Sequence, residues 1–167
     1  LILVKRIEEA IASIDYAIEL KPDFAEAYSN LGNILIGLGR ADEAVRNYNK
    51  AIQLRPDLAE VYANRGNALK ELGQLDEAMS SYGKAIQLKP GYAKGHRDLS
   101  LLKKYASDDP QIGLMEGLFI DSDLNESDRM HLYFALGKAF GDVGEYDKSF
   151  KYLEKGNNLR NKTLNYN

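Results

Sequence analysis

Apolar residues recur at helical spacing along most of the chain and predict pairs of short helices. Within residues 25–58 the apolar positions fall three or four residues apart, which is the periodicity of one helix face. A glycine separates this stripe from a second stripe of smaller residues. The first stripe consists of Tyr28, Leu31, Leu35 and Leu38, and the second of Ala44, Tyr48 and Ala51.

The residues between and after these stripes predict where each helix begins and ends. Gly39 directly follows the first stripe, where a left-handed C-terminal cap is common. Asp42 and Glu43 place negative charge at the start of the second helix, facing the positive end of its dipole. Pro56 cannot continue that helix. Because Gly32 has no side chain, we expect the second helix to approach its backbone closely, as a helical hairpin.

The same pattern recurs at a fixed interval of 34 residues, marked by Pro22, Pro56 and Pro90. Residues 25–58 and 59–92 carry the same amino acid at 19 of 34 positions. A fixed period of this size is typical of stacked supersecondary units, each of which buries its apolar face against its neighbours. The sequence therefore predicts an array of helical hairpins.

These repeats resemble the tetratricopeptide repeat family. The family places an aromatic residue, a Leu-Gly pair, two small residues around an aromatic one and a proline at fixed offsets. The resemblance implies an all-α fold, a right-handed superhelical solenoid of antiparallel hairpins, and binding of a protein or peptide partner. The matching residues are Tyr28, Leu31, Gly32, Ala44, Tyr48, Ala51 and Pro56 in the first repeat, and Tyr62, Gly66, Ala78, Tyr82, Ala85 and Pro90 in the second, with Arg65 in place of the leucine.

The flanking sequence predicts partial or divergent repeats around these two. Residues 7–20 are typical of the second helix of an earlier repeat, whose first helix is missing or reduced to residues 1–4. After Pro90 the pattern weakens and then returns around Gly137. The predicted divisions are a partial repeat over 1–24, repeats over 25–58 and 59–92, a divergent hairpin over 93–125, a divergent repeat over 126–162, and a tail over 163–167.

The N-terminal helix is predicted to expose an apolar edge. Terminal repeats need a polar outer face for solubility, but this helix carries several apolar residues without an evident partner. We expect Leu3, Val4, Ile7 and Ile11 to be covered by a second copy of the chain or by residues that precede it. The alternative is modest exposure of a few apolar groups.

Four asparagines at matching offsets are candidate peptide-binding residues. Helix interiors do not favour asparagine, yet Asn30 and Asn33 recur as Asn64 and Asn67. An amide offers both a donor and an acceptor, which an extended peptide backbone needs. The same asparagine position binds peptides in the repeats of the O-linked N-acetylglucosamine transferases, which residues 25–92 resemble. The alternative is drift on a solvated face. The peptide-binding prediction comprises Asn30, Asn33, Asn64, Asn67, Lys70, Lys94 and Arg97.

A second resemblance gives an alternative function. Residues 93–162 are similar to the segment that joins such repeats to the catalytic domain in bacterial repeat–sulfotransferase fusions. The glycine-rich loop that would bind the sulfonate donor is absent from this sequence. The resemblance therefore implies a non-catalytic N-terminal recruiting or assembly domain of a sulfotransferase or another transferase.

Composition narrows the chemistry further. The chain has no cysteine and a formal net charge of −3, which argue against disulfides, zinc–thiolate sites and nucleic-acid binding. No apolar run is long enough for a membrane span, and we expect a cytoplasmic protein without cofactor, metal or catalytic residues. His96 and His131 are interpreted as packing or surface residues. Asp121, Asp123 and Asn125 imitate the start of a calcium loop, but the later ligands are missing.

Overall fold

The computed structural model describes the backbone of residues 2–121 and 123–165 and the side chains of residues 6–120 and 123–163. This part of the chain contains nine helices and no strand. The helices form two compact units, one ending at Leu88 and the other beginning at Lys89. Each unit is described by itself below.

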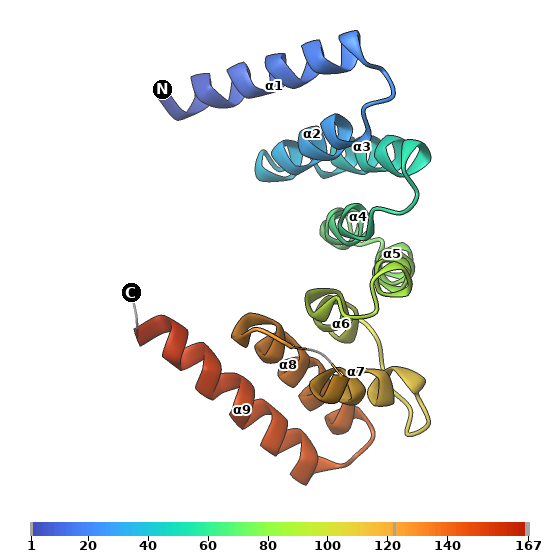
Figure 1. The fold of residues 1–167 in the computed structure, drawn as a ribbon, viewed down its shortest axis with the longest axis vertical. Coiled ribbons are helices and arrows are strands. Elements are labelled where there is room, and N and C mark those ends of the chain that lie inside the picture. Colours follow the sequence, from blue (N-terminus) through green and yellow to red (C-terminus); the bar gives the residue numbers. More distant parts are fainter. Residues whose placement is uncertain (1, 122, 166–167) are drawn as a thin grey trace. The chain divides into compact units, whose positions relative to one another are not determined.

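The first unit consists of consecutive helical hairpins. α2 pairs with α3 and α4 pairs with α5, while α1 packs against α2 and α3 against α4 (Figure 1). The helices are α1 (Ile2–Leu20), α2 (Ala25–Gly37), α3 (Ala41–Leu54), α4 (Ala59–Glu71) and α5 (Leu75–Leu88).

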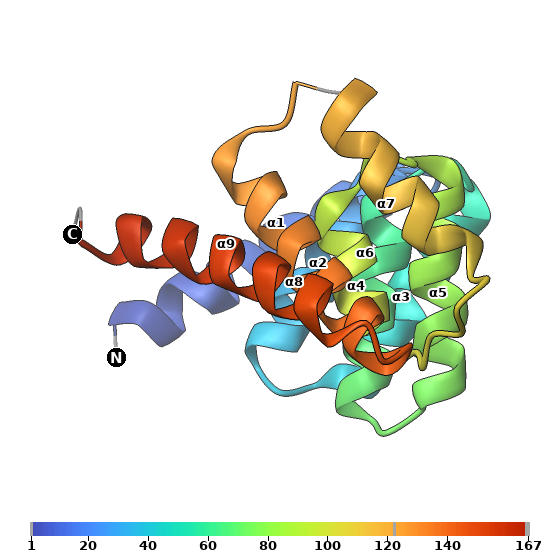
Figure 2. The same cartoon turned by 90° about the horizontal axis from the view of Figure 1, so that it is seen from below.

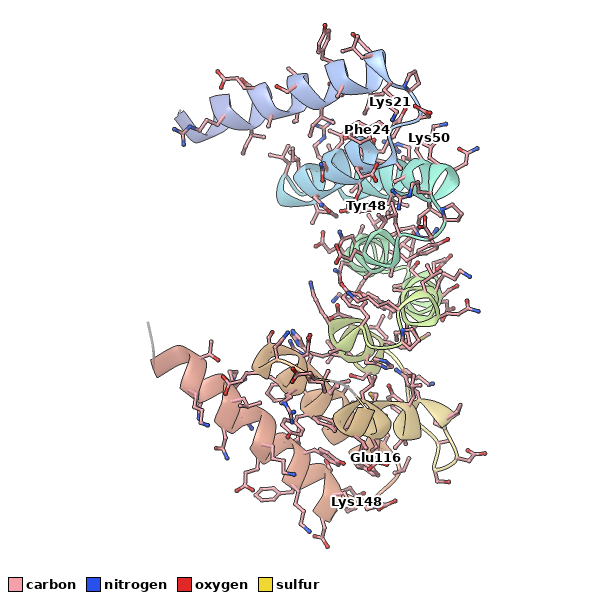
Figure 3. All side chains as sticks on the ribbon, in the orientation of Figure 1. Lys21, Phe24, Tyr48, Lys50, Glu116 and Lys148 are labelled. Atoms are coloured by element: carbon pink, nitrogen blue, oxygen red, sulfur yellow. The ribbon has the colours of Figure 1, made fainter. Side chains whose placement is uncertain are left out.

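A tyrosine packed onto a glycine holds each hairpin of this unit together. Tyr48 on α3 lies in the interior of the first unit and is only 1% exposed (Figure 3). A Cβ atom placed on Gly32 would lie 2.6 Å from the Tyr48 ring, far inside van der Waals contact. Gly66 and Tyr82 repeat this relationship at the same distance in the next hairpin. The predicted close approach at Gly32 is therefore confirmed.

The turn within each hairpin is closed by a glycine with positive φ. Gly39 has a φ of 70° and Gly73 a φ of 74°, a region that side chains with a Cβ rarely adopt. The following amide then bonds back into the helix: Arg40 N–H donates to the Leu35 carbonyl at 2.9 Å. This is the hydrogen bond of a Schellman cap, and it confirms the predicted cap at Gly39.

The first helix differs from its predicted extent. Residues 2–6 continue α1 instead of forming a remnant of a separate helix, so α1 begins five residues before the predicted start at residue 7. No proline or glycine interrupts residues 2–20, which allows one continuous helix.

One face of α1 is less covered than the corresponding face of α3. Ala10, Ile14 and Ala17 are half-buried, whereas the residues at the same repeat positions in α3 are fully buried. Of the predicted self-association residues, Ile7 and Ile11 are also half-buried, and the side chains of Leu3 and Val4 lie outside those that the structure describes.

The second unit contains one further hairpin and two shorter elements around it. α8 and α9 run side by side, and α6 and α7 each pack against α8 (Figures 1 and 2). Met115, Leu132 and Leu136 lie at the centre of its core, fully buried. The helices are α6 (Ala93–Ser100), α7 (Pro110–Asp121), α8 (Glu126–Asp142) and α9 (Tyr146–Asn165).

The helix pairing differs from the hairpin predicted over residues 93–125. α6 makes its main helix contact with α8 and not with α7. It ends at Ser100, and the loop after it is held by other groups. Lys103 pairs with Asp109 at 2.7 Å, and the Tyr105 N–H donates to the Asp142 carboxylate of α8 at 3.1 Å. These contacts fix the loop against α8 and leave α6 and α7 separated along the chain.

The C-terminal helix continues into the predicted tail, because α9 ends at Asn165 and not before residue 163. Near its beginning it is tied to α7, where the Tyr152 hydroxyl donates to Glu116 at 3.1 Å. Glu116 and Lys148 lie on the same side of the second unit (Figure 3). Glu145 and then Glu116 raise the pKa of Lys148.

Candidate functional site

Three of the predicted asparagines meet in one small pocket of the first unit. The pocket has a volume of about 110 Å³ and is lined by Asn33, Ile36, Tyr48, Asn64 and Asn67. These residues come from α2, α3 and α4, and therefore from two successive repeats. We call it the asparagine pocket.

Asn33 is oriented by two donors on its side-chain oxygen. The Tyr48 hydroxyl donates to Asn33 Oδ1 at 2.8 Å, and Asn64 Nδ2 donates to the same oxygen at 3.0 Å. The first bond joins the two helices of one hairpin, and the second joins α2 to α4. Asn33 therefore has a structural role that the sequence analysis did not assign to it.

Asn67 is oriented in the same way in the second repeat. Its Oδ1 accepts a 2.8 Å hydrogen bond from the hydroxyl of Tyr82, which packs on Gly66 as Tyr48 packs on Gly32. The asparagines at this offset are therefore explained in part by a recurring Tyr–Asn hydrogen bond, and drift on a solvated face does not account for them.

The hydrogen bonds fix which amide atoms remain for a ligand. Among residues 6–120 and 123–163, the structure gives no partner to Nδ2 of Asn33, to Oδ1 of Asn64 or to Nδ2 of Asn67. The pocket therefore offers donor, acceptor and donor groups. An extended peptide presents carbonyl oxygens and N–H groups in alternation, which is the complementary set.

The walls of the pocket carry no charge. Burial raises the pKa of Tyr48 to about 12, and Glu71 raises it further, so the phenol stays protonated at neutral pH and keeps donating to Asn33. An uncharged, amide-rich pocket suits a neutral polar ligand better than an ion.

The other predicted binding residues lie elsewhere. Asn30 on α2 is exposed and Lys70 on α4 is half-buried, and neither lines the asparagine pocket. Lys94 and Arg97 belong to α6 in the second unit. There the Arg97 guanidinium lies 5.5 Å from the Phe134 ring centre and 3.4 Å from His131 Nδ1.

Two residues of the pocket were missed by the sequence analysis. Ile36 and Tyr48 line it, but both had been counted only as packing residues. A signal was present for Tyr48, because the pair Asn33 and Tyr48 recurs together as Asn67 and Tyr82.

The remaining polar candidates are used within the fold. Asn125 caps α8, its Oδ1 accepting from the Asp128 N–H at 2.8 Å. His96 is fully buried, with Nε2 2.8 Å from the Pro90 carbonyl and Nδ1 3.2 Å from Gln111 Nε2. In the described residues, no group of three or more histidine, aspartate or glutamate side chains is placed to hold a metal ion.

The described helices were also compared with the requirements of a membrane span. None of them combines sufficient length with sufficiently apolar composition to cross a bilayer.

Family models match the chain over most of its length. A model described as a TPR repeat matches residues 5–39 and 32–73, and two described as tetratricopeptide repeats match residues 59–92 and 131–163. The last match covers the divergent repeat of the second unit. No curated protein matches the sequence.

Solved structures of repeat proteins share the fold. The crystal structure of MamA is 23% identical with a TM-score of 0.69, covering 96% of this chain and 92% of that one. YrrB, a TPR protein whose structure is described as having an unusual peptide-binding site, is 18% identical with a TM-score of 0.67, covering 98% and 83%. A mutant O-GlcNAc transferase from Thermobaculum terrenum is 25% identical with a TM-score of 0.58, covering 70% of this chain and 23% of that one. The predicted all-α fold of helical hairpins is confirmed, and the chain belongs to the tetratricopeptide repeat family.

Proposed function

We propose that this chain is a protein-interaction scaffold that binds an extended peptide backbone in the asparagine pocket. The observation that carries this function is the fixed donor, acceptor and donor order of Asn33, Asn64 and Asn67. Since Tyr48 and Tyr82 hold two of these amides before a ligand arrives, binding costs little side-chain entropy. Asn30 extends the same helix face by one repeat position, and Lys70 follows Asn67 by one helical turn.

The uncharged walls favour recognition of the backbone over recognition of particular side chains. YrrB, which shares the fold, is described as a TPR protein with a peptide-binding site, and this supports the same class of ligand here. Lys94 and Arg97 would add contacts to an acidic part of the partner only if the ligand also reaches the second unit.

An assembly role within a larger transferase is a second candidate. It is supported by the similarity of residues 93–162 to the segment before the catalytic domain of repeat–sulfotransferase fusions, and by the structural likeness to a transferase that contains such repeats. In that case the asparagine pocket would recruit the acceptor protein, and the chemistry would belong to another domain.

The test begins with an array of blocked nine-residue peptides probed with the full 167-residue chain. The best binder is then compared with versions that carry a single N-methylated peptide bond. N-methylation at one or two registers should abolish binding because the N–H that faces Asn64 Oδ1 is lost, whereas most alanine substitutions in the peptide should have little effect.

A protein variant tests the same contact from the other side. Asn64→Ala removes one hydrogen bond worth about 1 kcal/mol, so the dissociation constant should rise about fivefold. Gln53→Ala, an exposed change on α3, is the matched control. Equal affinity for wild type and Asn64→Ala, or binding that is indifferent to N-methylation, would exclude the asparagine pocket as the binding site.

A further inference from the structure

Arg65 departs from the repeat pattern and is held by neutral groups. It stands on α4 where the preceding repeat has Leu31, and its side chain is half-buried. Its Nε and Nη2 donate to Ser81 Oγ at 3.1 and 2.9 Å, and its Nη1 donates to Asn49 Oδ1 at 3.1 Å. The guanidinium thus joins α3, α4 and α5.

The groups around Arg65 are arranged to hold it in place. Ser81 is fully buried, and its hydroxyl donates to the Glu77 carbonyl at 2.8 Å, which turns its lone pairs toward the guanidinium. The Arg65 guanidinium carbon lies 5.5 Å from the Tyr62 ring centre. In the preceding repeat Asn47 takes the position of Ser81, so this arrangement belongs to a single repeat.

The charge of Arg65 is not balanced nearby. Within the described part of the chain, Arg65 forms no ion pair. Burial lowers the pKa of Arg65, with a partial opposing effect from Tyr62 and none from a carboxylate. Buried charges in proteins are usually paired, because removing them from water is costly.

A pocket of about 300 Å³ lies beside this guanidinium. Its walls combine the apolar side chains of Val45 and Leu69 with polar groups, and none of its residues lines the asparagine pocket. The full set of lining residues is Val45, Asn49, Arg65, Leu69, Gln74 and Glu77. Glu77 is solvent-exposed, and its negative charge in the wall disfavours a multiply charged ligand.

We propose that this second pocket binds a single carboxylate carried on a small apolar group, with Arg65 as the anchor. A guanidinium has five N–H groups and three are used by Ser81 and Asn49, which leaves a donor on each Nη atom for a carboxylate. Asn49 Nδ2 adds a neutral donor, and Val45 and Leu69 provide the apolar wall. The volume suits a ligand at the small end of the usual range.

The first test uses the wild-type chain and a matched pair of probes. N-acetyl-leucine carries the carboxylate and the apolar group, and N-acetyl-leucinamide has the same shape without the charge. In calorimetric and NMR titrations, the acid should bind at least tenfold more tightly than the amide and shift the signals of Val45, Arg65 and Leu69. Equal binding of the two probes, or no binding of the acid at about 10 mM, would overturn the assignment.

Variants locate the contact. Arg65→Leu restores the residue type of Leu31 and should weaken binding of N-acetyl-leucine at least tenfold. Arg46→Leu, an exposed arginine on α3, should leave it unchanged. Unaltered affinity in Arg65→Leu would refute the site. If this variant does not fold, the comparison of acid and amide on the wild type still decides.

A third probe identifies the source of the carboxylate. Acetyl-Ala-Glu-Ala-amide offers the group on a peptide side chain. Tighter binding of this peptide than of N-acetyl-leucine points to a glutamate of a partner protein, and the reverse order points to a small free acid. Failure of the asparagine pocket to bind peptides would leave this site unaffected, since the two share no residue.

Discussion

The Tyr48 hydroxyl donates a 2.8 Å hydrogen bond to Asn33 Oδ1, and Tyr82 makes the same bond to Asn67. The first pair joins α3 to α2, and the second joins α5 to α4. Each tyrosine ring fills the space that a glycine leaves open, and each hydroxyl reaches an amide at the mouth of the hairpin. The same side chain therefore holds the hairpin together and orients a candidate ligand-binding group.

Asn33→Ala should destabilise the first unit by about 1–3 kcal/mol, because it leaves the hydroxyl of the buried Tyr48 without its acceptor. Asn30→Ala, on an exposed site of the same helix, should change stability by no more than about 0.5 kcal/mol. Urea unfolding followed by circular dichroism measures both. A similar effect of the two substitutions would show that the Tyr48 bond contributes nothing to stability.

Gly32→Ala should also be destabilising, by about 1–3 kcal/mol, because its Cβ would lie 2.6 Å from the Tyr48 ring and force α2 and α3 apart. Gly37→Ala is the control, since no atom lies within 4 Å of the added Cβ. It should be neutral or stabilise the helix by up to about 1 kcal/mol. Thermal unfolding of the two variants gives the comparison, and equal melting temperatures would contradict the packing described here.

Asp142 is expected to hold the loop between α6 and α7. Its carboxylate accepts from the Tyr105 N–H and pairs with Lys138, and these interactions hold the pKa of Asp142 below its usual range against the effect of burial. Asp142→Ala should cost about 1.5–3 kcal/mol and expose residues 101–109 to proteolysis. Asp142→Asn keeps an acceptor for Tyr105 and should lose less. Identical cleavage of both variants and wild type would argue against this role.

The second unit should lose stability as the pH falls below about 6.5. Burial lowers the pKa of His96, with the Pro90 carbonyl opposing it, and burial followed by Arg97 lowers the pKa of His131. Both histidines therefore stay neutral in the folded chain where the unfolded chain binds protons. Their contribution is complete above the unfolded pKa of 6.5 and is lost as the pH falls toward the folded values.

Urea midpoints measured between about pH 7.5 and 5 test this expectation, because the carboxylates with lowered pKa values respond only at lower pH. The double variant His96→Asn, His131→Asn should show a smaller change over this range than wild type, whatever its absolute stability. The same slope in both proteins would assign the pH dependence to other groups.

Self-association through α1 remains a prediction. Ile7 and Ile11 are half-buried in the single chain, and Tyr16 and Leu20 on the same helix are largely exposed. Ile7→Glu together with Ile11→Glu should reduce any concentration-dependent increase in mass seen by sedimentation velocity. Monomeric wild type at every concentration would remove this surface from consideration.

The first unit was predictable because its two repeats state the same pattern twice. Gly32, Gly39 and Pro56 each have one physical use, and the recurrence 34 residues later separates that use from chance. Helix positions, the turn and the packing of Tyr48 follow from it. The orientation of the amides did not, because the Asn33 side chain can face solvent, Tyr48 or Asn64 with the same backbone.

The second unit was predicted less completely, for an equally specific reason. His96 occupies the position of an aromatic residue but is fixed by Pro90 and Gln111, so the repeat pattern does not report its contacts. The pairing of α6 with α8 depends on the long-range bond between Tyr105 and Asp142, which local periodicity cannot reveal. The pocket beside Arg65 likewise follows from one departure from the pattern, and its partners lie on two other helices.

The glycine turn has a consequence for how the chain folds. Gly144, with a φ of 82°, closes the α8–α9 hairpin as Gly39 and Gly73 close theirs, and each is followed by an amide bonded 2.9 Å back into the preceding helix. Every hairpin can therefore form from contacts close in sequence, the condition under which chains fold quickly. No single nucleus is required, and folding can start at any of these three turns and spread to neighbouring helices.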